Sequence, residues 1–332
     1  MKNFLSTLDL GKNQLNSLLD DAQRLKQGKA AGTLAGKTMG MVFFNSSLRT
    51  RTSFEAGMFQ LGGHALNLAV GGDLWDLETA DGVVMDGARA EHVKEAVPVL
   101  SSYVDVLGVR AFAQGADYAF DRTDPVLSAF ASYSEVPVIN MESGLWHPCQ
   151  ALADALTWNQ AGIRPGDDIA LVWCRHPKPL PMAVPNSVMM MAAQMRLNIS
   201  VIRPAPFALD PELCAMASEE AEKNGGSVTH TDDVNALAGA KVVYAKSWGS
   251  IEAYGNAQQH AAFTNDFSSW QVTGDLMQKT DNAVFMHCLP VRRNVVVSDE
   301  VLDSEYSMVV QQAENRLHVQ KALLLKLIGN KQ

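Results

Sequence analysis

The stretch FFNSSLRTRTSF, residues 43–54, decides how the first half of this chain folds. It starts within an apolar run, residues 38–44, that predicts a buried strand, and it leads into a helical segment over residues 50–61. A short polar turn lies between the strand and the helix. The N-terminus of such a helix presents backbone N–H groups that have no partner within the helix, and these favour an anion.

Two arginines in this stretch strengthen the prediction of an anion site. Arg49 and Arg51 lie at or near the first helical turn, where the helix dipole repels cations. A bound phosphate would compensate, because a guanidinium binds phosphate through paired, charge-assisted hydrogen bonds. Ser47 and Thr50 add hydroxyl donors to the same turn. The alternative is an ordinary capped helix whose arginines extend into solvent.

Length and composition indicate a globular protein of two domains. The chain has 332 residues, of which 47% are hydrophobic and 19% charged, so a large core and a folded chain are expected. The formal net charge of −9, with no basic tail, argues against a nucleic-acid partner. An anionic substrate would therefore need a local positive pocket, because the overall field repels it.

The cysteines and the N-terminal residues indicate where the protein is located in the cell and whether it binds a metal. Cys149, Cys174, Cys214 and Cys288 form neither a CxxC pair nor a zinc-binding spacing, so reduced thiols are expected. The N-terminal residues lack the apolar core of a signal peptide, and no apolar run approaches the length of a membrane span. We expect a cytoplasmic protein that uses no metal and no cofactor.

Strand-like and helix-like segments alternate along the chain, which predicts an α/β protein with two doubly wound parallel sheets. The expected strands cover residues 38–44, 64–70, 104–110, 136–140, 169–174, 199–203, 228–230, 241–245 and 283–287. The expected helices cover residues 15–25, 50–61, 91–103, 124–133, 149–160, 187–195, 211–224, 276–279 and 313–328. Ligands of such folds gather beyond the carboxyl ends of the strands, where Arg49, Arg110 and Glu142 are expected.

Three motifs carry a resemblance to a known family. SSLRTRTSFE (residues 46–55), HPCQALAD (residues 147–154) and HCLPVRRN (residues 287–294) are similar to the three signatures of the aspartate and ornithine carbamoyltransferases. They stand in the expected order and span most of the chain. The resemblance implies that an amine attacks the carbonyl of carbamoyl phosphate and that phosphate leaves.

The resemblance also implies a division into domains and a set of site residues. Residues 1–146 with 312–332 would bind carbamoyl phosphate, residues 147–311 would bind the acylated ornithine, and the last helix would pack back on the first domain. Arg49, Arg110 and His147 are expected to be catalytic. The carbamoyl phosphate-binding residues implied are Ser47, Leu48, Arg49, Thr50, Trp75, Arg110, His147, Pro148, Cys149, Gln150, Cys288, Leu289 and Arg316. Trp75 would reach a neighbouring active site in a homotrimer.

The run VVYAKSWGS, residues 242–250, bears on the identity of the amine. The resemblance places Lys246 where ornithine enzymes have an aspartate that holds the free α-amino group. A lysine cannot pair with an ammonium group but can pair with a carboxylate, so the α-nitrogen is expected to be acylated. The branch of the family that acts on N-acylornithine matches at Glu142, His176, Lys246 and Arg292.

Two further positions favour one acyl group over another. Acetyl-specific members of the branch have a glutamate at the position of Ala90 and a lysine at that of Val296. A glutamate at position 90 would repel a succinyl carboxylate, whereas alanine leaves room for it. Ala90 is therefore the expected specificity residue. The expected substrate is N-succinyl-L-ornithine, in arginine biosynthesis, with N-acetyl-L-ornithine as the alternative.

A proline-rich segment, PKPLPMAVP over residues 177–185, predicts a stiff loop that is neither helix nor inner strand. The resemblance implies that this loop passes through a later loop to form a knot.

A non-catalytic, anion-binding relative of the enzymes is the functional alternative, although the three intact motifs argue against it. A nucleotide-binding protein is excluded by the lack of a GxxxxGK loop.

Overall fold

The computed structural model describes residues 2–28 and 33–329, in two compact units. The first unit contains residues 1–114, 119–149 and 316–332, and the second contains residues 115–118 and 150–315. The divisions fall within α6 (Pro148–Gln160) and α12 (Val309–Ile328), a few residues from the expected boundaries. Met1 and residues 330–332, which belong to the expected first domain, lie outside the described residues.

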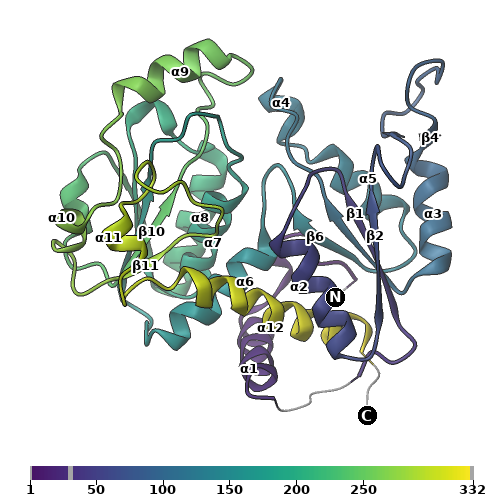
Figure 1. Cartoon of the computed structure of the whole chain (residues 1–332), viewed down its shortest axis with the longest axis horizontal. Coiled ribbons are helices and arrows are strands. Elements are labelled where there is room, and N and C mark those ends of the chain that lie inside the picture. The colour runs from purple at the N-terminus through teal and green to yellow at the C-terminus, as the bar shows by residue number, and fades with distance from the viewer. Residues whose placement is uncertain (1, 29–32, 330–332) are drawn as a thin grey trace. The chain divides into compact units, whose positions relative to one another are not determined.

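The first unit contains a parallel sheet with the strand order β2-β1-β5-β6 (Figure 1). Its strands are β1 (Thr38–Phe43), β2 (His64–Ala69), β5 (Val106–Arg110) and β6 (Val138–Glu142). Its helices include α1 (Lys12–Lys26), α2 (Arg49–Gln60), α3 (Val93–Tyr103) and α5 (Pro125–Tyr133). Val42, Leu107 and Val138 from three strands share one cluster with Val97 of α3 and Phe130 of α5. Apolar residues on these helices therefore hold α3 and α5 on one face of the sheet.

The C-terminal part of α12 packs on α2 in the same unit. At Gly57, in the middle of α2, an added Cβ would meet the Lys321 side chain at 3.3 Å and that of Leu317 at 3.6 Å. The lack of a side chain at this glycine allows the close approach of the two helices. The part of the last helix from Arg316 onward thus packs within the first unit, as expected, although the helix begins at Val309, in the second unit, rather than at residue 313.

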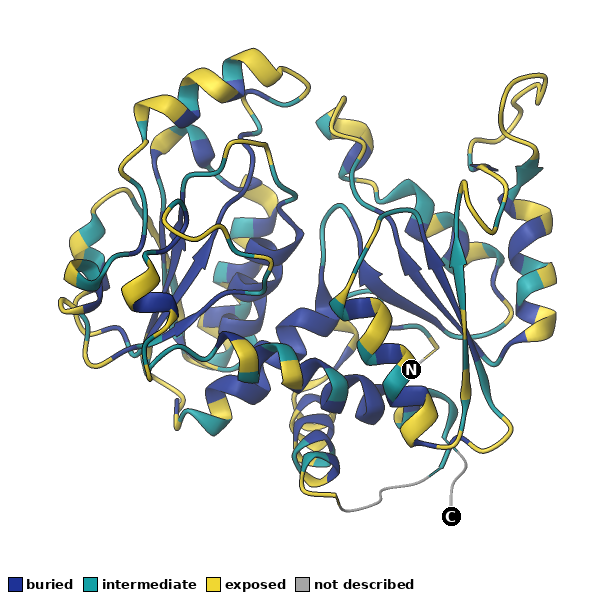
Figure 2. Ribbon diagram, in the orientation of Figure 1, coloured by how far each residue is buried: buried dark blue, intermediate teal, exposed yellow. Residues whose placement is uncertain are grey.

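The second unit contains a parallel sheet with the order β11-β10-β7-β8-β9. Its strands are β7 (Asp168–Trp173), β8 (Asn198–Ile202), β9 (Ser227–Thr231), β10 (Val242–Lys246) and β11 (Val284–Met286). Its helices include α7 (Ala183–Gln194), α8 (Pro211–Asn224), α9 (Ala257–Asp266), α10 (Gly274–Met277) and α11 (Asp299–Leu302). The inner strands of both sheets, such as β1, β5, β7 and β10, are largely dark blue in Figure 2 because they are buried, whereas the edge strands β2 and β9 contain no buried residue. The predicted fold class is confirmed.

The proline-rich segment corrects one prediction. Residues 177–182 form a loop, but α7 already begins at Ala183, so Pro185 lies in its first turn. A proline is tolerated there, because the first N–H groups of a helix have no partner within it. The loop contacts the segment after β10, since the Gly249 N–H donates to the Leu180 carbonyl at 2.9 Å. The knot stays a prediction.

The described residues contain neither a membrane-spanning helix nor a metal-binding cluster of side chains. No helix there is both long and apolar enough to cross a membrane. No group of three or more His, Cys, Asp or Glu side chains within residues 2–28 and 33–329 is placed to hold a metal ion.

Candidate active site

The turn between β1 and α2 gathers basic side chains from two other parts of the first unit. The Ser47 hydroxyl accepts the Thr50 N–H at 3.1 Å and so fixes the first turn of α2. Thr50 is 1% exposed, and its hydroxyl oxygen accepts from Arg316 Nη2 at 2.8 Å and from Arg110 Nη1 at 3.5 Å. Residues far apart in the sequence therefore converge on the predicted phosphate turn.

The two arginines singled out in the sequence differ in their surroundings. Arg49 is half-buried, whereas Arg51 is exposed, as is Leu48 with 71% of its surface accessible. Arg51 lies two residues after Arg49 on an exposed part of α2, so its role as a second partner of the same ligand stays a prediction. Leu48 is the N-cap residue of α2, and its expected contact with the phosphate stays a prediction.

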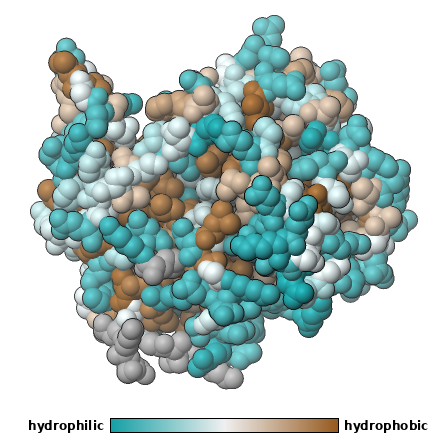
Figure 3. All heavy atoms as spheres, turned by 180° about the vertical axis from the view of Figure 1, so that it is seen from behind, coloured by the Kyte–Doolittle hydropathy of each residue, from teal (hydrophilic) through white to brown (hydrophobic). Residues whose placement is uncertain are grey.

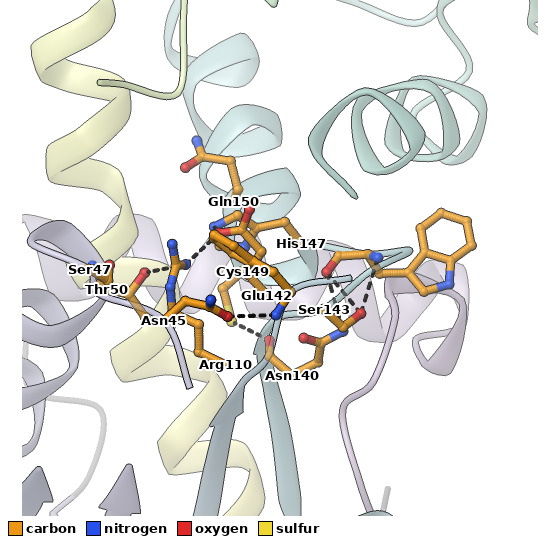
Figure 4. A network of polar contacts seen from close by, with 12 residues as sticks. Asn45, Ser47, Thr50, Arg110, Asn140, Glu142, Ser143, His147, Cys149 and Gln150 are labelled. Atoms are coloured by element: carbon orange, nitrogen blue, oxygen red, sulfur yellow. Dashed lines mark hydrogen bonds and ion pairs between the residues drawn. The ribbon is translucent and has the colours of Figure 1, made fainter. Parts of the chain in front are cut away.

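Glu142 joins this cluster through the register of the sheet. Arg110, at the end of β5, pairs with Phe43 of β1 on one side and with Glu142 of β6 on the other. The Glu142 carboxylate forms an ion pair with Arg110, and its Oε2 lies 3.2 Å from His147 Nε2 (Figure 4). His147 Nε2 is also 3.3 Å from Arg316 Nη1. Glu142 was predicted to bind the other substrate, but its carboxylate lies among the predicted carbamoyl phosphate residues.

The cluster carries more positive than negative charge. Burial lowers the pKa of Arg316; the charges of Arg110 and Arg49 act in the same direction, and that of Glu142 opposes them. The Arg110 guanidinium also lies 4.6 Å from the ring centre of Phe112, an arrangement that favours a cation. Three guanidiniums near one carboxylate make a local excess of positive charge that favours an anion.

Cys149, in the first turn of α6, is not a nucleophile. Its side chain is fully buried, and its Sγ lies 3.6 Å from the carbonyl oxygen of Asn140. Burial raises the pKa of this thiol to about 12, so it stays protonated at neutral pH. Any contact of Cys149 or Pro148 with a substrate would therefore be non-covalent.

The predicted residues at the start of α6 and after β11 are linked within the second unit. Gln150 donates to Asp154 at 2.9 Å, and Asp154 also accepts from Gln312 at 2.7 Å. Gln312 Oε1 in turn accepts the His287 N–H at 3.0 Å, and the Leu289 N–H donates to the His287 ring at 2.9 Å. Gln312 was not predicted, because nothing in its local pattern distinguishes it from other polar helix residues.

A second basic group lies near the carboxyl ends of β7 and β10. Lys246, the last residue of β10, is 7% exposed, and its ammonium donates to the carbonyl of Ser247 at 3.0 Å. Arg292 Nε donates to His176 Nε2 at 2.9 Å. His176 must therefore be neutral in this arrangement, with its proton on Nδ1, 2.9 Å from the Lys178 carbonyl. Three residues predicted to bind the amino acid thus lie in one unit, and two of them are in contact.

Trp75 and Ala90 lie on a long segment between β2 and α3. Both are exposed, Trp75 by 71%. Glu78 holds the segment by accepting from Arg89 at 2.8 Å and from the N–H groups of Thr79 and Ala80. The loop between β3 (Leu77–Glu78) and β4 (Glu91–His92) projects at the upper left of Figure 3, with apolar residues at its tip. The homotrimer and the reach of Trp75 into a neighbour stay predictions.

Comparison with known proteins decides the family. Residues 2–160 match the carbamoyl-P binding domain of aspartate/ornithine carbamoyltransferases, and residues 181–327 match the Asp/Orn binding domain. The chain belongs to the aspartate/ornithine carbamoyltransferase family. Within that family it lies in the branch whose named members are carbamoyltransferases of N-acylornithines.

Two relatives and one solved structure illustrate the match to this branch. The N-acetylornithine carbamoyltransferase of Xanthomonas campestris is 45% identical, covering 99% of this chain and 98% of the relative. The N-succinylornithine carbamoyltransferase of Bacteroides thetaiotaomicron is 36% identical, covering 99% of each. A glutamate-to-alanine mutant of an N-acetyl-L-ornithine transcarbamylase, complexed with carbamyl phosphate and N-succinyl-L-norvaline, matches with a TM-score of 0.95 at 45% identity. That match covers 98% of this chain and 100% of the mutant.

The identities bear on the acyl group. The carbamoyltransferase named for N-acetylornithine is 45% identical, and the one named for N-succinylornithine is 36% identical. The relative named for the acetyl substrate, which the sequence analysis placed second, is thus the more similar of these two.

Proposed function

We propose that this carbamoyltransferase transfers the carbamoyl group of carbamoyl phosphate to the δ-amine of N-acetyl-L-ornithine. The products are N-acetyl-L-citrulline and phosphate, in the biosynthesis of an amino acid. The observation that carries the proposal is the convergence of Arg110, His147 and Arg316 around Thr50. The identity of 45% to an N-acetylornithine carbamoyltransferase supports the choice of amine.

The reaction assigns a task to each part of the cluster. The first turn of α2, with Arg49 and Arg110, holds the phosphate, and each charge-assisted hydrogen bond contributes about 1.5–3 kcal/mol. His147, with Thr50 and Arg110, stabilises the carbonyl oxygen as it becomes negative. Loss of one such donor typically lowers the rate about 10²- to 10³-fold.

The chemical step proceeds by addition and elimination. The neutral δ-nitrogen attacks the carbonyl carbon and forms the new C–N bond. The bond between that carbon and the bridging phosphate oxygen then breaks, and the phosphate leaves with the electron pair. The amine loses one proton, which we assign to the leaving phosphate.

The second unit supplies the amino-acid site in this proposal. Lys246 is buried and, within the described residues, its ammonium contacts only a backbone carbonyl, so a substrate carboxylate would give it an ionic partner. Arg292 and His176 would contact the rest of the acylated amino acid. A free α-ammonium group would be repelled by Lys246, which favours an acylated nitrogen.

A second candidate, N-succinyl-L-ornithine, is favoured by Ala90. The acetyl enzymes are expected to have a glutamate at this position, and we take it to be the glutamate replaced in the mutants that were complexed with N-succinyl-L-norvaline. In those proteins alanine, proline, valine or serine stands in its place. This chain has alanine at position 90 without mutation, which would leave room for the longer succinyl group of N-succinyl-L-ornithine.

One assay tests both candidates. Citrulline formation is measured with carbamoyl phosphate and N-acetyl-L-ornithine, N-succinyl-L-ornithine or L-ornithine. We expect the highest kcat/KM with the acetyl substrate and little turnover of ornithine. A higher kcat/KM with the succinyl substrate would establish the second candidate, and Ala90→Glu would then lower that value selectively. Turnover of ornithine alone, or of none of the three amines, would refute the proposed function.

A further inference from the structure

A hydrogen-bonded turn connects two side chains of the site. Glu142 is the last residue of β6, and His147 immediately precedes α6. Their side chains meet, with 3.2 Å between Glu142 Oε2 and His147 Nε2. Residues 143–146 close the loop between them. The conformation of these four residues therefore sets the distance and direction between the carboxylate and the imidazole.

The turn is held from outside by one carboxylate. Asp124 Oδ1 accepts the N–H groups of Gly144 at 2.7 Å and Leu145 at 3.3 Å, and its Oδ2 accepts the hydroxyl of Ser143 at 2.6 Å. Figure 4 shows Ser143 among its polar partners next to Glu142 and His147. Three hydrogen bonds from consecutive residues to one side chain leave the turn little freedom.

The turn is also tied inward. The Ser143 hydroxyl oxygen accepts the Trp146 N–H at 3.2 Å and the Asn140 side-chain amide at 3.0 Å. Asn140 lies within β6 and is fully buried, and its amide also donates to the Leu5 carbonyl at 2.9 Å. The turn is thereby joined to the sheet as well as to Asp124.

The hydrogen bonds between Asp124 and residues 143–145 require an unfavourable backbone conformation at one residue and a glycine at another. Asp124 has a left-handed backbone with φ of 46°, which is unfavourable for a residue with a side chain. At Gly144 an added Cβ would lie 2.9 Å from Asp124 Oδ1 and 3.1 Å from the Asp121 carbonyl. Only glycine lets the turn approach the carboxylate so closely. Burial raises the pKa of Asp124, whereas the bonds from Ser143 and Gly144 lower it.

We propose that Asp124 is a positioning residue for carbamoyl transfer: its hydrogen bonds to residues 143–145 fix His147 and Glu142 relative to each other and to Arg110. This inference rests on the role of His147 in the proposed function. Misplacement of a catalytic group by about 1 Å can lower the rate about 10²-fold. The hydrogen bonds of Asp124 can therefore affect turnover although Asp124 does not touch a substrate.

The second unit offers a matched control. Asp124 and Asp210 each precede a proline at the start of a helix, α5 and α8 respectively, but only the side chain of Asp210 caps its own helix. Its carboxylate accepts the N–H groups of Glu212 at 2.8 Å and Leu213 at 3.4 Å, and the hydroxyl of Tyr118 at 2.6 Å. The two aspartates thus accept the same kinds of bond, but those of Asp210 do not involve the turn before His147. A role limited to stability would give the two Asp→Asn variants similar kinetics.

The experiment compares Asp124→Asn, Asp210→Asn, His147→Asn and the double variant Asp124→Asn/His147→Asn in the full chain. The amine is whichever acylornithine the wild type uses best. We expect Asp124→Asn to lower kcat about 10- to 100-fold. Calorimetric binding of inorganic phosphate should stay within about twofold, since the turn before α2 is intact. Asp210→Asn should keep kcat within about twofold of the wild type.

The double variant supplies the decisive comparison. If Asp124 acts through His147, Asp124→Asn lowers kcat much less when His147 is already asparagine. An undiminished loss in that background, or equal kcat values for the two single Asp→Asn variants, would overturn the inference. If Asp124→Asn shows no thermal unfolding transition, Ser143→Ala replaces it, with an expected smaller loss of kcat. A wild type that is inactive with every acylornithine refutes the proposed function instead.

Discussion

The two units carry basic clusters that differ in how their charge is balanced. In the first unit, Arg110 forms an ion pair with Glu142, which also contacts His147. In the second unit, Lys246 donates to a backbone carbonyl and Arg292 to a neutral histidine. Within the part of the chain that the structure describes, neither Lys246 nor Arg292 contacts a carboxylate. The first cluster contains its own anion, and the second lacks one.

This difference indicates how each cluster receives its ligand. On the proposed function, a phosphate that enters the first cluster would compete with Glu142 for Arg110. A carboxylate that enters the second cluster displaces no protein carboxylate from Lys246 or Arg292. We therefore expect the two clusters to respond in opposite ways when a charge is removed.

The largest effect is expected from Lys246→Gln. Loss of a charge-assisted hydrogen bond of about 1.5–3 kcal/mol should raise KM for the acylornithine roughly 10- to 100-fold. Binding of inorganic phosphate, measured by calorimetry, should be unaffected. Lys178→Gln, an exposed lysine in the loop after β7, is the control and should behave as the wild type. An unchanged KM in Lys246→Gln would show that the substrate carboxylate is bound elsewhere.

A smaller effect of the opposite sign is expected from Glu142→Gln. Removal of a negative charge beside Arg110 should tighten the binding of inorganic phosphate to the free enzyme roughly fivefold, since a like charge at this range costs about 1 kcal/mol or more. Glu135→Gln, an exposed residue of the same unit, is the control. Weaker phosphate binding in Glu142→Gln would mean that Glu142 orients Arg110 instead of competing for it.

The smallest effect concerns pH and His176. Burial, together with Arg292 and Lys246, lowers the pKa of His176 below its usual 6.5, so the unfolded chain binds the proton more readily than the native one. The stability contributed by neutral His176 is therefore present above pH 6.5 and is lost as the pH falls through 6.5 toward the lowered pKa.

A variant that cannot titrate isolates this contribution. His176→Gln keeps an acceptor for Arg292, and its free energy of unfolding should fall less than that of the wild type between pH 7.5 and 5.5. Solvent screens this half-exposed ring, so the difference should be at most about 1 kcal/mol. Denaturant unfolding at the two pH values measures it, and identical losses in both proteins would exclude His176 as the source.

Much of the fold could be predicted, because its signals are local. The apolar run of residues 38–44, the polar turn and the following helix correspond to β1, the Ser47 turn and α2. Elements with weak periodicity were missed: α9 contains few apolar residues, and nothing in its sequence distinguishes it from a loop. Pro185 misled the prediction for α7, since a proline in the first turn leaves a helix intact.

The site was predictable in its members but not in their pairing. The family resemblance implied Arg110, His147 and Arg316. The structure brings both arginines to Thr50 and Arg316 to His147, while their roles stay predictions. The carboxylate of Glu142 forms an ion pair with Arg110 because the register between β5 and β6 places the two residues side by side. A single sequence does not reveal this register. The role of Asp124 was not predicted either, because its hydrogen-bond partners lie 19 to 21 residues further along the chain.

The position of Arg316 has a consequence for synthesis of the protein. Its partners His147 and Thr50 lie 169 and 266 residues earlier in the chain. The ribosome therefore synthesises His147 and Thr50 long before Arg316, and a partial chain that ends before Arg316 lacks one of the guanidiniums of this cluster. Domains generally fold as units during synthesis, but the basic cluster of the first unit is complete only after α12 has been made. A chain that ends before Arg316 should therefore show little carbamoyl transfer.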